Sequence, residues 1–200
     1  MSRGLIALRS RAAGVLALAL ALAGGTWSLA NLHPVRAVER IDGSISFATP
    51  PRLVETIANF RAAYTPNAVY YFTLDLPEEA GEPLRKVTVT KLAGGSTIYY
   101  NLDLFQAFEG NYRRRGNPLY LAEVSLNRDE ETVSMIFDPP VPPGREVTIG
   151  LRSIRNPQIP GVYLFEVTAF PAGRAGQSTN GQSLGIGRIH FYRFRGGTTF

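Results

Sequence analysis

Cysteine is missing from the 200-residue sequence, and this absence excludes several classes of protein. A chain without thiols has no disulfide framework, thiolate nucleophile, iron–sulfur cluster or lipid-modified amino-terminal Cys. Histidine is scarce too, because His33 and His190 are the two in the chain. We therefore expect no metal site and no cofactor. The balance of 44% hydrophobic and 18% charged residues predicts an ordinary globular core.

Long hydrophobic runs are also absent, except near the amino terminus. Three arginines precede residues 12–23, which are all Ala, Gly, Val or Leu. A positive segment, an apolar stretch of this length and then small residues are typical of a secretory signal peptide. The sequence predicts that residues 1–37 are this signal, cleaved after Ala37, and that residues 38–200 form a single domain.

Two alternatives remain open at this end of the chain. Small residues also precede Ala30, so cleavage after residue 30 is a second option. The uncharged stretch from Ala12 through Leu32 has 21 residues, enough to cross a bilayer as an uncleaved anchor over 12–32. Each version predicts that the rest of the chain is exported. The expected location is the periplasm or the cell surface, with the thylakoid lumen as an alternative.

The basic net charge belongs mostly to this leader. The whole chain carries 21 basic and 16 acidic residues, and its isoelectric point of about 9.7 suggests a nucleic-acid partner. Residues 1–37 hold four of the arginines and no acid, so 17 basic residues face 16 acidic ones in residues 38–200. We expect no nucleic-acid partner for a nearly neutral exported domain.

Residues 38–200 read as a series of strands. Short runs rich in Val, Ile, Tyr, Phe and Thr alternate with Gly, Pro and Asn clusters, which indicates an all-β sandwich or barrel. The eight predicted strands are Ser44–Ala48, Val69–Asp75, Arg85–Lys91, Leu119–Leu126, Thr132–Phe137, Glu146–Arg152, Gly161–Phe170 and Ile186–Phe194. Two short helices are predicted at Pro51–Ala62 and Leu102–Phe108. The expected fold is an immunoglobulin-like antiparallel β-sandwich with one or two short helices.

One motif suggests an enzyme. Residues 181–185 match G-x-S-x-G, with Ser183 at its centre. A nucleophile elbow requires a strand before the serine and a helix after it, whereas a polar loop precedes and a strand follows here. The last acid of the chain, Glu166, also comes before Ser183 rather than after it. We therefore expect no catalytic residues and no enzymatic activity.

Glu166 interrupts an otherwise apolar strand. Because buried carboxylates are normally paired, we expect a structural ion pair between Glu166 and a cross-strand partner, Arg188 or His190. With no second histidine beside it, His190 is expected to be a hydrogen-bonded or half-exposed strand residue rather than a base.

The one concentrated charge feature is Tyr112-Arg113-Arg114-Arg115. Three adjacent arginines beside an aromatic residue suggest an interaction tip for lipid headgroups, an anionic polysaccharide or an acidic protein. The competing interpretation is a solvated loop with no partner.

A set of segments along residues 50–192 resembles a known family. In order they are PPRLV (50–54), VYYFTL (69–74), LPEEAGEPL (76–84), VTV (87–89), FDPPVPPG (137–144), VTIGL (147–151), RNP (155–157), GVYLF (161–165), VTAFPAG (167–173) and GIGRIHFY (185–192). In these the sequence is similar to the cyanobacterial exported family catalogued as domain of unknown function 2808. The resemblance implies an exported β-sandwich without an assigned activity, and it supplies no catalytic residues. Arg113–Arg115 are not part of the family pattern.

These observations predict an exported, non-catalytic binding or accessory protein of the cell envelope or photosynthetic membrane. Its expected partner is a protein or an envelope polymer, with an anionic membrane surface as a further option. The alternative function is a carbohydrate-binding module or a cell-wall-associated enzyme. A third hypothesis, strand donation to partners, requires an exposed edge strand.

Overall fold

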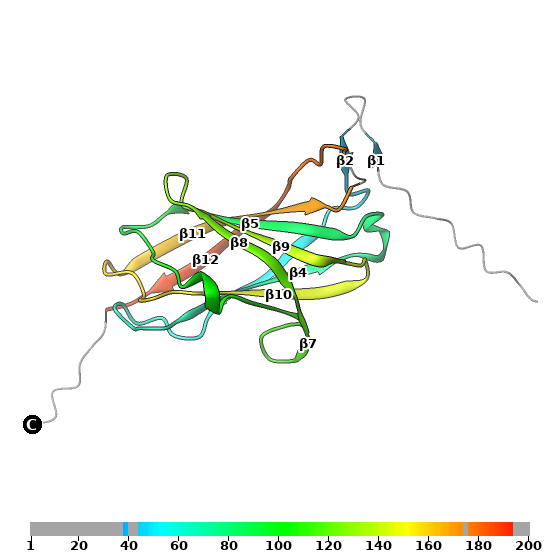
Figure 1. The fold of residues 1–200 in the computed structure, drawn as a ribbon. Coiled ribbons are helices and arrows are strands. Elements are labelled where there is room, and N and C mark those ends of the chain that lie inside the picture. The colour runs from blue at the N-terminus through cyan, green and yellow to red at the C-terminus, as the bar shows by residue number, and fades with distance from the viewer. Residues whose placement is uncertain (1–37, 40–43, 174–175, 194–200) are drawn as a thin grey trace, which may run out of the picture. The chain divides into compact units, whose positions relative to one another are not determined.

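The computed structural model describes residues 38–39, 44–173 and 176–193, and the predicted signal peptide and anchor lie outside them. The described residues form two five-stranded antiparallel sheets packed face to face (Figure 1). The predicted all-β, immunoglobulin-like sandwich is confirmed. No helix among the described residues is long and apolar enough to cross a membrane.

The two sheets draw their strands from distant parts of the chain. The first sheet has the order β3 (Arg52–Ala58), β4 (Val69–Leu76), β10 (Arg145–Arg152), β6 (Gln106–Gly110) and β7 (Arg115–Leu119). The second has the order β12 (Gln182–Phe191), β11 (Gly161–Pro171), β5 (Leu84–Ala93), β9 (Thr132–Val141) and β8 (Leu121–Asn127). A small pair, β1 (Val38–Glu39) with β2 (Ile45–Ser46), and two 3₁₀ turns, η1 (Glu78–Ala80) and η2 (Leu102–Leu104), complete the described elements.

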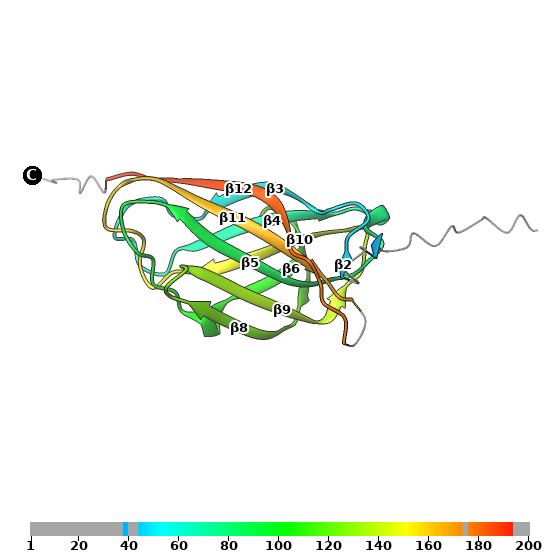
Figure 2. The same ribbon diagram turned by 90° about the horizontal axis from the view of Figure 1, so that it is seen from above.

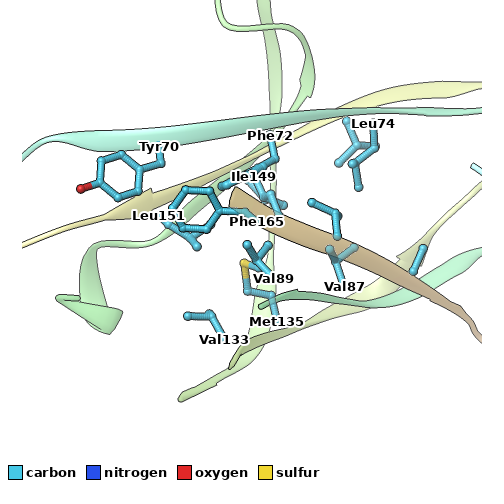
Figure 3. Close-up of a cluster of buried hydrophobic side chains, with 14 of the residues drawn as sticks. Tyr70, Phe72, Leu74, Val87, Val89, Val133, Met135, Ile149, Leu151 and Phe165 are labelled. Carbon is cyan, nitrogen blue, oxygen red and sulfur yellow. The ribbon is translucent and has the colours of Figure 1, made fainter. Parts of the chain in front are cut away.

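The core forms where the inward faces of the two sheets meet. In the central strands, alternate residues point inward, and the apolar ones among them are almost completely buried (Figure 3). From the first sheet these include Tyr70, Phe72, Leu74, Ile149 and Leu151, and from the second Val87, Val89, Val133, Met135 and Phe165. Their period of two is the same pattern that predicts the strands from the sequence.

The two predicted helices are wrong. Residues 52–58 form the edge strand β3, and residues 102–108 form the single turn η2 followed by the start of β6. In β3 a register shift between Leu53 and Glu55 breaks the alternation of apolar residues. The spacing of Leu53, Val54 and Ile57 therefore imitates a helical face, although β-branched side chains there favour a strand.

The two sheets are connected or in contact along both of their long sides. On one side the chain passes through Tyr120 directly from β7 of the first sheet into β8 of the second. On the other side β3 and β12, the edge strands of the two sheets, lie next to each other (Figure 2). They are joined at one end by a parallel bridge between Ala62 and Tyr192. We call this contact between β3 and β12 the seam.

Candidate binding site at the seam

A groove follows the seam on the surface of the sandwich. It consists of a hollow of about 410 Å³ and a smaller one of about 260 Å³, which share Thr56 and Arg188. The larger hollow is lined by Thr56, Ile57, Ala58, Asn59, Phe60, Arg61, Tyr112, Arg188, Ile189, His190 and Tyr192. We call the two hollows together the seam groove.

Gly187 allows the two edge strands to approach each other. A Cβ atom on this buried glycine would lie 2.5 Å from Thr56 Oγ1 and 3.1 Å from the Phe72 ring. Any side chain at position 187 would therefore push β12 away from β3. The seam groove has a closed floor because position 187 has no side chain.

A buried amide fixes the segment that carries Phe60 and Arg61. Asn156 is 2% exposed, and its Nδ2 donates to the carbonyls of Phe60 at 3.0 Å and Ala62 at 2.9 Å. Its Oδ1 accepts a hydrogen bond from the Tyr70 hydroxyl at 2.8 Å. Burial raises the pKa of Tyr70 well above the usual value, which keeps this hydroxyl protonated as a donor.

The backbone around Arg61 is held from β12 as well. The Tyr192 amide donates to the Arg61 carbonyl at 2.9 Å, and the Ala63 amide donates to the Tyr192 carbonyl at 2.8 Å. Arg61 and Tyr192 therefore meet at one end of the seam groove on a segment bonded from both sides. Such a segment needs little ordering when a ligand binds.

The surface around this end is basic without nearby acids. Residues 56–74, 147–165 and 167–193 contain no Asp or Glu. The described residues form four ion pairs, Arg52–Asp75, Arg85–Asp138, Lys91–Glu131 and Arg145–Glu109, and none includes an arginine of these three segments. At the other end of the groove Glu55 lines the smaller hollow. The end that holds Arg61, Arg188 and His190 is thus suited to an anion.

Aromatic rings stand beside these cations. Phe60 and Tyr192 are 55% and 51% exposed, and Tyr112 lines the groove from the β6–β7 loop. The Tyr112 ring packs on Tyr71 with 4.8 Å between ring centroids. Three rings and three cationic or titratable side chains therefore share one groove.

The predicted interaction tip divides into two parts. The Arg115 guanidinium lies 4.9–5.5 Å from the ring centroids of Phe108, Tyr71 and Tyr112. It also donates a hydrogen bond to the Tyr71 hydroxyl at 2.9 Å, so Arg115 holds the loop against the first sheet.

Arg113 and Arg114 form the part of the tip whose guanidinium groups lie over no ring among the described residues. Their backbone amides donate to Asn111 Oδ1 at 3.1 and 3.0 Å, which shapes the turn and leaves both side chains exposed. Their role as a binding tip stays a prediction.

The expected ion pair of Glu166 is not among those of the described residues. Glu166 lies opposite Ile186 in the β11–β12 ladder, whereas Arg188 and His190 lie opposite Leu164 and Val162. The Glu166 carboxylate is half-buried and accepts a hydrogen bond from Ser183 Oγ at 2.9 Å. Glu166 lies on the outer face of the sheet and is only half-buried, so its charge does not require a cation as partner. The Ser183 hydroxyl forms the hydrogen bond instead.

Ser183 lies within β12 and not at a strand-to-helix turn. Its hydrogen-bond partner is Glu166, and His190 lies seven residues further along the same strand. A nucleophile elbow needs a serine that is held at a sharp turn and paired with a base. The surroundings of Ser183 have neither feature.

A second hollow, of about 250 Å³, lies between the ends of β5 and β8. Lys91 and Glu131 both line it, and their charges are already paired at 2.6 Å. Burial also raises the pKa of Tyr100, another lining residue, well above its usual value. The seam groove is the stronger candidate, because its cations have no carboxylate partner among the described residues.

The sequence singles out three residues that the structure brings together in the seam groove: Tyr112, Arg188 and His190. It misses Phe60, Arg61 and Asn156. One sequence feature could have pointed to these three residues. They lie in residues 56–74 and 147–165, which contain no acidic residue.

Comparison with solved structures finds β domains of low sequence identity. The collagen-binding subdomain of the Enterococcus faecalis surface protein ACE is 9% identical, covers 68% of this chain and 94% of its own, and has a TM-score of 0.41. The C-terminal domain of the Streptococcus pyogenes antigen I/II-family protein AspA is 14% identical, covers 78% of this chain and 45% of its own, and has a TM-score of 0.40.

No curated protein matches the sequence significantly. A family model does match it: the model described as Protein of unknown function (DUF2808) covers residues 44–191. This match includes every strand of both sheets, and it begins and ends close to the bounds of the sandwich. The chain therefore belongs to the DUF2808 family of proteins of unknown function.

Proposed function

We propose that this protein is an exported, non-catalytic binding protein of the cell envelope or photosynthetic membrane, and that an anionic protein or envelope polymer is its partner. The observation that carries the proposal is the acid-free end of the seam groove. There Arg61 and Arg188 lie beside exposed aromatic rings without a carboxylate partner among the described residues. Unpaired arginines on a preorganised surface favour recognition of an anion.

The amino-terminal sequence supports export. Arginines, an apolar run and small residues in residues 1–37 match the order of a secretory signal. Sequencing the amino terminus of the protein purified from its source tests this part. A first residue at Val38 or Asn31 supports cleavage, and an intact Met1 or Ser2 contradicts it.

The absence of activity is part of the proposal. Ser183 is engaged by Glu166 and not by a histidine, and its strand has no elbow geometry. Strand donation at the seam is not favoured either, because the edges of β3 and β12 contact each other there.

The binding proposal can be tested by co-sedimentation of the purified protein with isolated cell envelopes. The double variant Arg61→Ala/Arg188→Ala should lose sedimentation, and high salt should release the wild type, because both remove attraction to an anion. Arg128→Ala is the control at the second hollow, which Arg128 lines, and Arg128 is exposed and forms no ion pair among the described residues. Equal sedimentation of the double variant and the wild type would contradict the proposal.

A further inference from the structure

The seam groove has the length and direction of a site for a linear chain. Its lining runs on the β3 side from Leu53 to Arg61 and on the β12 side from Ile186 to Tyr192. The six residue steps of extended backbone from Ile186 to Tyr192 correspond to about 20 Å. A groove of this length can contact several consecutive units of a polymer.

The floor of the groove leaves no space for an added β-strand. At Gly187 the two edges are so close that a single Cβ atom would overlap Thr56 Oγ1. At the far end the backbones of Arg61 and Ala63 already bond to Tyr192. An extended peptide gains affinity at a sheet edge by pairing with free backbone groups, and these edges offer little such pairing.

The side chains above the floor provide two kinds of contact. Arg61 and Arg188 can each bind a carboxylate through two parallel hydrogen bonds. The exposed rings of Phe60 and Tyr192 offer flat apolar faces beside these cations. A uronic acid unit has both matching features on one ring, since its carboxylate projects from a pyranose with an apolar face.

We infer that the seam groove binds a polysaccharide that bears carboxylates, with its sugar rings against the aromatic side chains and its carboxylates on Arg61 and Arg188. This inference rests on the proposed function and names its ligand class. An acidic polypeptide would use the arginines and leave the rings without a role. An anionic lipid surface would likewise attract the arginines without using the rings along the groove.

Isothermal titration of the purified protein with three probes tests the inference. The probes are oligogalacturonate, its methyl ester and poly-L-glutamate of matched charge. The ester keeps the sugar rings and blocks the carboxylates, and the polypeptide keeps the carboxylates without the rings. We expect oligogalacturonate to bind, and the other two to bind at least about tenfold more weakly, which is the effect of losing one charge-assisted contact.

Variants of the protein supply the second comparison. Arg61→Ala and Arg188→Ala should each weaken oligogalacturonate binding about tenfold or more, and Tyr192→Ala should weaken it several-fold. Arg128→Ala should bind like the wild type. Circular dichroism and melting curves of each variant show that its fold is intact.

The outcomes separate the inference from the proposed function. If poly-L-glutamate or anionic lipid vesicles bind as well as oligogalacturonate and Tyr192→Ala has no effect, the polysaccharide inference is wrong and the anion-binding function stands. If none of these probes binds and the Arg61→Ala/Arg188→Ala double variant still sediments with envelopes, both are wrong.

Discussion

At the scale of single residues, Asn156 connects the core to the surface. Its side chain accepts from Tyr70 inside the sandwich and donates to two carbonyls of the segment that carries Phe60 and Arg61. A buried amide with three hydrogen bonds fixes one geometry, because each alternative leaves a polar group unpaired. The position of Arg61 thus depends on a residue that contacts no ligand.

Replacing Asn156 by Ala should reduce the free energy of unfolding by roughly 3 kcal/mol, because three hydrogen bonds are lost at a buried site. Denaturant titration measures the change. Asn117→Ala is the matched control, since the Asn117 amide makes one exposed hydrogen bond to Glu109 at 3.2 Å. A loss no larger in Asn156→Ala than in the control would show that the buried amide does not hold this segment.

Tyr70 predicts how stability depends on alkaline pH. Burial raises the pKa of the folded Tyr70 above the ordinary value of 10.0, so the unfolded chain releases this proton first. The stabilising contribution is complete below about pH 10 and is lost as the pH rises above it. The free energy of unfolding, measured at increasing pH, should fall above this point and fall less steeply in Tyr70→Phe. Parallel curves for the two proteins would contradict the assignment to Tyr70.

At the scale of elements, the seam depends on the close contact between β3 and β12. Gly187→Ala should reduce the free energy of unfolding by about 1–3 kcal/mol, because the new methyl group overpacks against Thr56 and Phe72. Adding Thr56→Ala should recover part of this loss by removing the nearest atoms. Thermal melts of the single and double variants provide the measurement, and a fully stable Gly187→Ala protein would contradict this packing.

The β6–β7 loop depends on Arg115 in the same way. Arg115→Gln removes the cation from above three rings and should cost about 1 kcal/mol of stability. Arg114→Gln should change stability by less than about 0.5 kcal/mol, because the Arg114 guanidinium, unlike that of Arg115, lies over no ring among the described residues. Equal melting temperatures for the two variants would show that the stacked guanidinium contributes nothing.

Most of the strands could be predicted from the sequence, whereas the edge strands β3 and β7 could not. Strands β5 and β9 alternate buried and more exposed residues, so their register is visible in the sequence. Strand β7 contains Gly116 and Pro118 and has no such pattern, and β3 contains a register shift. Both lie at sheet edges, where tertiary pairing rather than local preference decides the conformation.

The candidate site could be predicted only in part for a related reason. Arg188 and His190 can be identified in the sequence because they are polar residues in an apolar predicted strand. Tyr112 can be identified because three arginines follow it. Nothing local connects them with Arg61, which lies more than a hundred residues away from β12 in the sequence. Sequence patterns report what lies on one strand, whereas the seam groove forms where two sheets meet.

At the scale of the whole sandwich, one end concentrates the features of an interaction surface. The described residues include twelve exposed large hydrophobic side chains, and nine of them lie at the end where β3 finishes and β4 begins: Phe60, Tyr64, Leu92, Tyr99, Leu104, Ile154, Ile159, Val162 and Tyr192. Strands β1 and β2 lie at the opposite end of the sandwich (Figure 1). The chain therefore enters the sandwich away from the end at which we place the binding site.

The most direct test of the binding function is site-specific photo-crosslinking in intact cells. A photoreactive residue in place of Tyr192 lies in the seam groove, and one in place of Tyr120, which is 70% exposed, lies at the opposite side where β7 passes into β8. We predict adducts with envelope material from position 192 and not from position 120, and their loss in the Arg61→Ala/Arg188→Ala background. Recovery of the protein as a free monomer from position 192, or equal adducts from both positions, would contradict a binding function located at the seam groove.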